Sequence, residues 1–264
     1  MKKAMDSIQN VWKHNLEEEM ANIRRLVDKY NYVSMDTEFP GVVAKPLGSF
    51  KSQTSFAYQQ LRCNVDILNI IQLGISISDE NGKRPEPVHT WQFNFQFSLD
   101  SDMYSQESID LLIQAQINFK EHSKYGIDIK EFGSLLTTSR LVMSDKIIWI
   151  SFHSAYDFAY LIKVLTGNLM PEREEDFYKF MHILFPCFYD FKLLLQTTEH
   201  HRKGLQEISN DLGLVREGTA HQAGSDALLT SQAFFKSFDV FLKKEAIRSM
   251  ICKLFGIEYL TDSI

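Results

Sequence analysis

The sequence has little of what defines secreted, membrane-spanning and zinc-binding proteins. It contains only three cysteines in 264 residues, and their wide spacing fits neither a disulfide framework nor a CxxC zinc site. No apolar run approaches the ~20 residues of a membrane span. The charged N-terminal stretch lacks the apolar core of a signal peptide. We therefore expect a soluble protein in a reducing, intracellular compartment.

Positive charge is scarce as well. Lysines and arginines number 28 against 34 aspartates and glutamates, so the formal net charge is −6. A protein that holds nucleic acid through its overall charge is usually basic, which disfavours that class. A metal-dependent nuclease is still compatible with this composition, because its bound cations supply positive charge where the phosphate lies.

The chain contains no internal repeat, no low-complexity tract and no long Gly/Ser/Pro linker. Hydrophobic residues make up 44% of the sequence, and a chain of this length buries a sizeable core. We predict a single domain that spans residues 1–264.

Hydrophobic periodicity predicts strands first and then helices alternating with strands. A helix is expected over 6–30, followed by strands at Tyr32–Phe39, Ile67–Ser78 and Val88–Phe97. The third strand alternates aromatic and polar residues, which is typical of a half-buried strand. Further helices are expected at about 105–122, 128–143, 155–166, 172–184, 204–212, 225–242 and 244–255, with short strands at Ile147–Ser151 and Phe188–Asp190. An antiparallel meander followed by such alternation predicts an α/β fold with a mixed central sheet surrounded by helices.

Two acids share the first predicted strand. Asp36 and Glu38 in the segment MDTE are two residues apart, so their side chains point to the same face, roughly 6–7 Å from each other. Two neighbouring carboxylates repel each other unless a cation lies between them. On spacing alone, a pair of exposed acids on an edge strand is an equally good interpretation.

A third acid, Asp157, follows the KIIWIS strand in the segment FHSAYDFAYL. Ser154 and Asp157 have the S-x-x-D spacing of a capping box, so a purely structural role is the favoured interpretation of this segment alone. The strand-to-helix junction nevertheless puts Asp157 at the carboxyl edge of the sheet, where α/β proteins usually build their sites.

A fourth acid, Asp226, lies with a histidine in HQAGSDALLT. Gly224 and Ser225 predict a break before the last long helix, whose dipole favours an acid in its first turn. Five helical positions would turn His221 about 140° away from Asp226. Both residues face one site only if His221 lies on the loop before the helix. A lone loop histidine is more often simply solvated.

Together, these four acids and His221 resemble the ordered set of the DEDDh exonucleases, whose fold is ribonuclease H-like. Longer segments are similar to the Ccr-associated-factor (Pop-type) deadenylases, the DEDDh catalytic subunits of the Ccr–Not complex. These segments are NLEEEM, YNYVSMDTEFPGVVAKP, LRCNVDILNIIQLGISI, TWQFNFQF, FHSAYDFAYLIKVLT, KGLQEISNDLGL and HQAGSDALLTSQAFFK. The resemblance runs from about Val11 to about Leu260. Its departures, alanines at 155 and 159 and the segment REGTA before His221, concern loop geometry and no metal ligand.

The resemblance implies a poly(A)-specific 3′→5′ exoribonuclease that releases 5′-AMP. In this family the four acids would hold two divalent cations, and an all-oxygen ligand set suits Mg²⁺ or Mn²⁺. Two such cations can stabilise both the attacking and the leaving oxygen. His221 would act as general base, because the unperturbed pKa of histidine lies near neutrality.

Contacts to the substrate are less visible in the sequence. Phe39, beside the end of the first strand, is a candidate platform for an unstacked base, although a core position is at least as good an interpretation. Lys45, Lys51 and Arg62 could meet phosphates, although scattered surface cations are usually solvated. No residue accounts for a preference for adenine.

The resemblance also implies partners and a location. They are single-stranded poly(A) RNA, a Not-type scaffold, a Ccr-type nuclease and Tob/BTG-type proteins, with no membrane, in the cytoplasm and nucleus. Two alternatives stay open. One is a DEDDh exonuclease of other substrate preference. The other is a non-catalytic scaffold, which the presence of all four acids and His221 disfavours.

Overall fold

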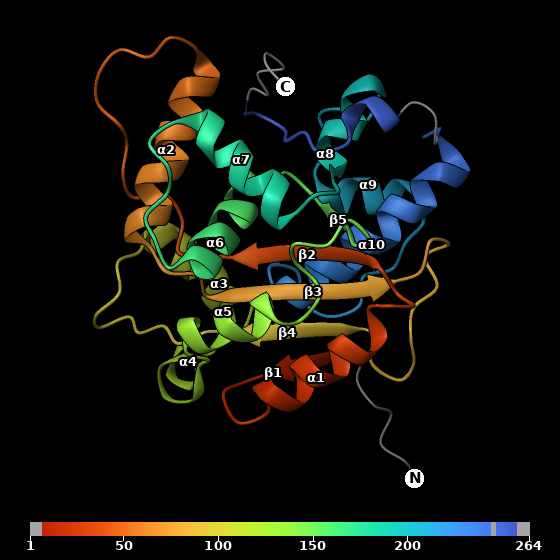
Figure 1. Cartoon of the computed structure of the whole chain (residues 1–264), viewed down its shortest axis with the longest axis horizontal. Helices are drawn as coiled ribbons and strands as arrows, with labels where there is room; N and C mark the ends of the chain where they lie inside the picture. Colours follow the sequence, from red (N-terminus) through yellow and green to blue (C-terminus); the bar gives the residue numbers. More distant parts are fainter. Residues whose placement is uncertain (1–6, 244–246, 258–264) are drawn as a thin grey trace.

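A computed structural model describes residues 7–243 and 247–257, and its centre is a six-stranded mixed sheet (Figure 1). The strands are β1 Ile8–Val11, β2 Tyr32–Glu38, β3 Gln72–Ser78, β4 Thr90–Asn94, β5 Ile148–Ser151 and β6 Phe188–Asp190. They lie in the order β1-β4-β3-β2-β5-β6. Neighbours are antiparallel from β2 to β4, whereas β5 and β6 run parallel to β2, and β1 runs parallel to β4. The predicted antiparallel meander and mixed sheet are confirmed.

Helices cover both faces of this sheet. They are α1 Leu16–Leu26, α2 Gln53–Ile67, α3 Gln106–Gln114, α4 Phe119–Tyr125, α5 Ile129–Thr137, α6 Ala155–Thr166, α7 Glu174–Leu184, α8 Phe191–Leu194, α9 Leu205–Asp211 and α10 Ala223–Val240. Helix α10 lies behind β2, β3 and β4, and α1, α5 and α6 lie in front (Figure 1). Among the described residues, no helix has the length and apolar character needed to cross a membrane.

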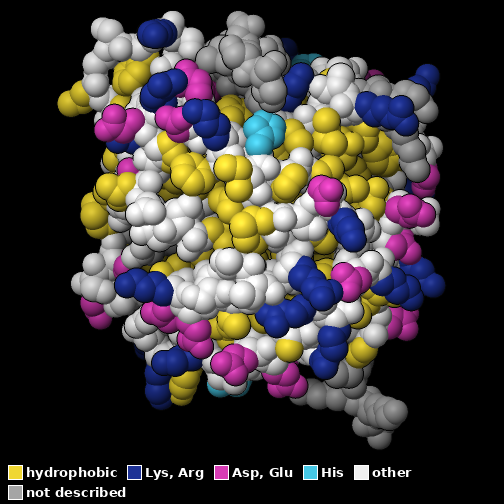
Figure 2. Space-filling view, in the orientation of Figure 1, with side chains coloured by type: hydrophobic (Ala, Val, Ile, Leu, Met, Phe, Trp, Pro, Cys, Tyr) yellow, Lys and Arg dark blue, Asp and Glu magenta, His cyan; other side chains and the backbone are white. Residues whose placement is uncertain are grey.

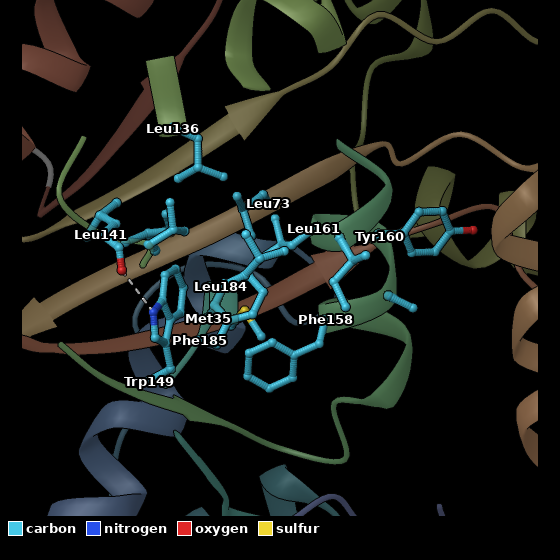
Figure 3. Packing of buried hydrophobic residues seen from close by; sticks show 14 of the residues in the cluster. Met35, Leu73, Leu136, Leu141, Trp149, Phe158, Tyr160, Leu161, Leu184 and Phe185 are labelled. Carbon is cyan, nitrogen blue, oxygen red and sulfur yellow. Dashed lines mark hydrogen bonds between the residues drawn. The ribbon is translucent and has the colours of Figure 1, made fainter. Parts of the chain in front are cut away.

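The two faces of the sheet differ in chemistry because side chains alternate along each strand. The front face is apolar and packs against α1, α2, α5, α6 and α7. Part of this core is seen in Figure 3, where the indole Nε1 of Trp149 donates to the carbonyl of Leu141 over 3.1 Å. The back face carries small and polar residues in register: Ser34, Asp36, Glu38, Gln72, Gly74, Ser76, Thr90, Gln92 and Asn94. The acids of β2 therefore face α10 and not the apolar core.

Gly74 lets α10 approach the back face closely. A Cβ atom at Gly74 would lie 1.9 Å from the carbonyl oxygen of Ala223, which only a side-chain-free residue avoids. The start of α10 thus rests directly on β3. Gly74 is the cross-strand partner of Asp36. The close approach at Gly74 therefore brings Asp226, in the first turn of α10, next to the acids of β2.

The positively charged side chains of the described residues do not gather on the face of the molecule drawn in Figure 2. Basic and acidic side chains are intermixed there around apolar areas, and the described residues form no continuous basic patch on that face. The described part of the face drawn in Figure 2 therefore has no concentration of positive charge that would attract a polyanion.

Several predicted boundaries are wrong. The helix expected from residue 6 is a strand over Ile8–Val11, paired in parallel with β4, before α1 begins at Leu16. The helix expected over 105–122 is broken between α3 and α4, where Asn118 caps α4 by accepting from Lys120 N and Glu121 N. Helix α5 ends at Thr137, short of the expected 143.

Further differences concern α2, β4 and the C-terminal region. Helix α2, capped by Ser52, was not predicted. Strand β4 is buried on both faces, since α10 covers its polar side. The helix predicted over 244–255 is wrong for most of the described part of that range: Ile247 is helical, Arg248–Met250 form a 3₁₀ turn, and residues 251–255 are not helical. There the main-chain N–H of Cys252 donates to Phe188 O (2.9 Å) instead. Residues 244–246 lie outside the described residues.

Candidate active site

The second half of β2 has an open edge, and the site forms along it. Strand β5 pairs only with Tyr32–Ser34 of β2, after which the chain turns away into α6. Asp36 and Glu38 lie beyond this pairing, on the back face of the sheet. Because β2 and β5 are parallel, the start of α6 lies at the same sheet edge as the two acids, as the sequence predicted.

Asp157 fills the open edge of β2. Its Oδ1 accepts hydrogen bonds from the main-chain N of Thr37 (2.8 Å) and from Thr37 Oγ1 (2.6 Å). Ser154, the residue before α6, makes no side-chain capping bond. The capping-box interpretation of this segment is therefore wrong: the carboxylate of Asp157 is directed at β2 and not at its own helix start.

A buried carboxylate holds the turn that delivers Asp157. Asp190 is fully buried at the end of β6, and its Oδ1 accepts from His153 N over 2.8 Å. Its Oδ2 accepts from Ser154 N (3.3 Å) and from Phe255 N (3.0 Å). Burial raises the pKa of Asp190, and these three main-chain donors counteract the rise. The turn before α6 is thus fixed by β6, the neighbour of β5.

Asp226 approaches from the opposite side, in the first turn of α10. The helix begins at Ala223, so Gly224 and Ser225 are helical and the predicted break at these residues is wrong. His221 lies on the loop before the helix, as the helical geometry required. Its backbone is left-handed (φ 60°), and its N–H donates to Asp226 Oδ2 over 2.8 Å. A non-glycine residue in this conformation is strained, which is common at functional sites.

A cation of the chain itself balances Asp226. Arg216 Nη1 donates to Asp226 Oδ1 (2.8 Å) and to Ser225 Oγ (3.1 Å). Its Nε donates to Gln206 Oε1 of α9 over 2.7 Å. Both oxygens of Asp226 are thereby held, one by Arg216 and the other by the main chain of His221.

These residues converge. One ligand atom each from Glu38, His221 and Asp226 lies within 4.8 Å of the others, a spacing suited to a metal ion. Burial raises the pKa of Asp36 well above its ordinary value, with Asp226, Asp157 and Glu38 adding repulsion. The pKa of Glu38 rises to about 8 through burial and then through Asp226 and Asp157, while Arg216 lowers it. Burial likewise raises the pKa of Asp157 to about 6, against the hydrogen bonds from Thr37.

The cluster carries an excess of negative charge, which bound metal ions would balance. Four carboxylates face a single arginine among the described residues, and three of the four have raised pKa values. Divalent cations would remove both the repulsion and the cost of burial. Oxygen donors are the ligands that hard ions such as Mg²⁺ and Mn²⁺ prefer. The residues present therefore fit the predicted metal site.

Phe39 and Arg62 have contacts of their own. The ring of Phe39 stacks on Tyr156 at 5.1 Å and 11°, and it is partly buried against the core. One face of Phe39 is thus occupied, and its role as a base platform stays a prediction. Arg62 lies on α2 near Glu172, at 3.9 Å. Lys45 is exposed.

Sequence reasoning missed three residues that hold the acids in place: Thr37, Asp190 and Arg216. Thr37 stands between Asp36 and Glu38, so alternation alone places its side chain on the opposite face, toward α6. Strand alternation could therefore have identified Thr37 from the sequence. Nothing in the sequence singles out Asp190, whose partners His153, Ser154 and Phe255 are distant in the chain. Arg216 lies only nine and ten positions before Ser225 and Asp226, but no periodicity links them, because they are separated by a loop.

A comparison with protein-family models matches the CAF1 family ribonuclease model over residues 11–132 and 128–234. The chain belongs to the CAF1 family of ribonucleases. A relative in Schizosaccharomyces pombe, the poly(A) ribonuclease pop2, is 48% identical over 250 residues, covering 95% of this chain and 75% of the relative. The CCR4-NOT transcription complex subunit 7 of Caenorhabditis elegans is 46% identical over 257 residues, covering 95% of this chain and 83% of the relative.

A solved structure agrees with this assignment. S. pombe Pop2p in its Mg²⁺- and Mn²⁺-bound form superposes with a TM-score of 0.91 at 47% identity, covering 96% of this chain and all of that one. The predicted fold, a ribonuclease H-like DEDDh exonuclease with a mixed sheet surrounded by helices, is confirmed.

Proposed function

We propose that this CAF1-family chain is a poly(A)-specific 3′→5′ exoribonuclease that shortens mRNA tails and releases 5′-AMP. The observation that carries the proposal is the convergence of Asp36, Glu38, Asp157 and Asp226 with His221 at one end of β2. The poly(A) preference rests on the likeness to a relative named as a poly(A) ribonuclease. We also propose that one exonuclease domain spans residues 1–264, because all described strands join one sheet.

Asp36, Glu38, Asp157 and Asp226 would hold two divalent cations, Mg²⁺ or Mn²⁺, which supply positive charge to the scissile phosphate when bound. The chain's own groups orient these ligands. Thr37 fixes Asp157, and Arg216 fixes Asp226. A full set of ligands argues against the non-catalytic scaffold.

His221 is the proposed general base. Its main chain is tied to Asp226, and its side chain is exposed next to Glu38 and Asp226. A ring nitrogen of His221 accepts the proton of the attacking water as the water oxygen bonds to the last phosphate. The bond from that phosphorus to the 3′ oxygen of the preceding nucleotide breaks, and this oxygen takes up a proton from solvent. The products are 5′-AMP and an RNA one nucleotide shorter with a free 3′-OH.

We further propose that the chain works within a Ccr–Not complex with a Not-type scaffold and a Ccr-type nuclease, in cytoplasm and nucleus. The C. elegans relative is named as a CCR4-NOT subunit, which supports membership. Tob/BTG-type proteins as partners rest on the family resemblance alone. Phe39, stacked on Tyr156 beside the site, is the proposed contact to the terminal base.

The proposal is tested with 5′-labelled RNA that carries a 3′ oligo(A) tail, beside an equal-length tail of mixed sequence, with Mg²⁺ or Mn²⁺. A ladder that shrinks from the 3′ end and slows where the A-tract stops is expected. Equal decay of both tails would leave the exonuclease and remove the poly(A) preference. No decay under either metal would contradict the enzyme assignment for the isolated chain.

A further inference from the structure

Helix α10, which carries Asp226, begins without a cap of its own. The side chain of Gln222, the residue before the helix, makes no capping bond. Two glutamines from the sheet take its place. Gln72 Oε1 on β3 accepts the N–H of Ala223 (3.2 Å), and Gln92 Oε1 on β4 accepts the N–H of Gly224 (3.0 Å). These two N–H groups have no partner within the helix, so the sheet satisfies them.

The same two amides also hold Gln222. Gln72 Nε2 and Gln92 Nε2 both donate to Gln222 Oε1, over 3.1 and 2.7 Å. Because a main-chain N–H can only donate, each sheet amide must turn its oxygen to the helix and its nitrogen to Gln222. Gln222 Nε2 in turn donates to the carbonyl of Ala115 over 2.8 Å.

We call Gln72, Gln92 and Gln222 the amide clamp. Gln72 and Gln92 are only 2% and 6% exposed, so their hydrogen bonds are protected from water. Breaking one would leave a buried polar group unpaired, which costs more than an exposed bond contributes. The side-chain amides of two asparagines accept further hydrogen bonds from the clamp. Gln72 Nε2 donates to Asn94 Oδ1 (2.9 Å), and Gln92 Nε2 donates to Asn10 Oδ1 (3.1 Å).

The position of the clamp ties it to the active site. Gln222 lies next to His221, and its carbonyl accepts the N–H of Asp226 over 3.0 Å. Gln72 is the cross-strand partner of Glu38, and Gln92 lies opposite Gly74, the partner of Asp36. The clamp therefore joins β3, the strand paired with the acids of β2, and β4 to the start of α10, which carries Asp226 and directly follows His221 and Gln222. An ordinary Ser or Asp cap would accept an N–H of the first turn without linking the helix to the sheet.

We propose that Gln72 and Gln92 are positioning residues of the active site. Their side-chain amides fix the start of α10 on the sheet and thereby set Asp226 and His221 against Asp36 and Glu38. This inference rests on the proposed function for its kinetic consequence, whereas its structural and metal-binding consequences hold without it.

The test uses Gln72→Met, Gln92→Met and the double variant, since methionine keeps the side-chain length and removes both hydrogen-bonding atoms. The matched control is Asn64→Leu. Asn64 is also a fully buried amide, and its Oδ1 accepts two main-chain N–H groups, those of Val43 and Ala44, away from α10. Three quantities are measured: amide hydrogen exchange over residues 219–228, Mn²⁺ affinity by calorimetry without RNA, and kcat and KM on oligo(A).

In the double variant we expect faster exchange at Ala223 and Gly224, Mn²⁺ affinity lowered by about 10-fold and kcat lowered by about 10–100-fold, with KM changed much less. Asn64→Leu should lose thermal stability but keep the exchange rates of α10 and the Mn²⁺ affinity. If the double variant does not fold, the single variants are compared with the control in the same way.

Two results would overturn the inference. One is unchanged exchange at Ala223 and Gly224 in every glutamine variant. The other is a loss of stability like that of Asn64→Leu with Mn²⁺ affinity and kcat within about twofold of the wild type, against the tenfold or larger loss that such partners usually show. A wild-type chain that leaves oligo(A) intact would remove the proposed function instead, and the exchange and Mn²⁺ measurements would still decide the role of the clamp.

Discussion

Arg216 and Asp226 form an ion pair of 2.8 Å in which both side chains are only 13% exposed. The pair brings a fixed positive charge of the chain to the edge of a cluster of acids. It lowers the pKa values of Asp36 and Glu38 against the burial that raises them. Arg216 also reaches α9 through Gln206, so the charge is held on two sides. The metal-free site is thus partly neutralised by the protein itself.

Arg216→Gln should therefore destabilise the metal-free protein. Removal of the guanidinium leaves the mostly buried carboxylate of Asp226 with one hydrogen bond fewer. We expect the free energy of unfolding to fall by about 1–3 kcal/mol at neutral pH. Arg216→Lys should recover only part, because lysine keeps the charge but cannot bridge Gln206, Ser225 and Asp226 together. Urea denaturation with a chelator measures the difference. Equal stability of wild type and Arg216→Gln would contradict the counter-ion role.

Asp36→Asn should abolish hydrolysis while the fold is kept. A neutral amide is a poor ligand for a hard cation, so turnover should fall more than about 100-fold. The metal-free variant should be at least as stable as the wild type, since a buried, mutually repelling carboxylate is removed. Oligo(A) shortening and thermal denaturation are measured side by side. A fully active variant would refute the assignment of Asp36 as a metal ligand.

The stability of the metal-free protein should fall as the pH rises from about 6.5 to about 8. The pKa of Glu38 is raised from 4.5 to about 8 on folding, so in this window the folded state keeps a proton that the unfolded state releases. Rising pH then favours the unfolded state. Below this window the trend is opposed, because burial lowers the pKa values of His89 and His122 from 6.5 to about 4, and rising pH there favours the folded state.

This pH dependence is checked by thermal denaturation with a chelator across the window. Glu38→Gln should flatten the decline, because the group that titrates is gone. Saturating Mn²⁺ should flatten it in the wild type, since a cation bound to the folded state favours the ionised acids. Stability of the metal-free protein that rises with pH over this window would contradict the raised pKa of Glu38.

His221→Ala should reduce kcat by about 10²–10⁴ while the affinity for Mn²⁺ changes little. The bond to Asp226 Oδ2 comes from the main-chain N–H of residue 221, which alanine retains. Single-turnover kinetics report the first quantity and calorimetry without RNA the second. A large drop in Mn²⁺ affinity would instead make His221 a metal ligand.

Gly74→Ala should displace the start of α10. The added Cβ would meet main-chain atoms of Ala223 and Gly224 at 1.9–2.6 Å, and backbone cannot rotate away as a side chain can. We expect a loss of about 1–3 kcal/mol in stability together with weaker Mn²⁺ binding. Gly204→Ala is the matched control, because its Cβ would approach only Glu207 Oε2, at 3.7 Å. Similar behaviour of the two variants would mean that α10 does not rest on Gly74 in solution.

The sequence by itself determined those features that depend on neighbours along the chain. Alternation in a strand puts Asp36 and Glu38 on one face, and the structure keeps them there. Helical periodicity predicted 155–166, the bounds of α6. The helical turn of 100° per residue required His221 to lie outside α10, where it is found. The order of the sequence motifs along the chain indicated the family.

Tertiary structure decided which groups hold these residues. Thr37 meets Asp157 across 120 positions, and Gln72 meets Ala223 across 151. Ile8–Val11 has helical spacing with the residues that follow but pairs with β4, because the sheet offers a free edge there. Local periodicity reports only which face a side chain takes within its own element. The partner on that face is set by how distant elements pack, and the hydrogen bonds that orient the acids form only after that packing.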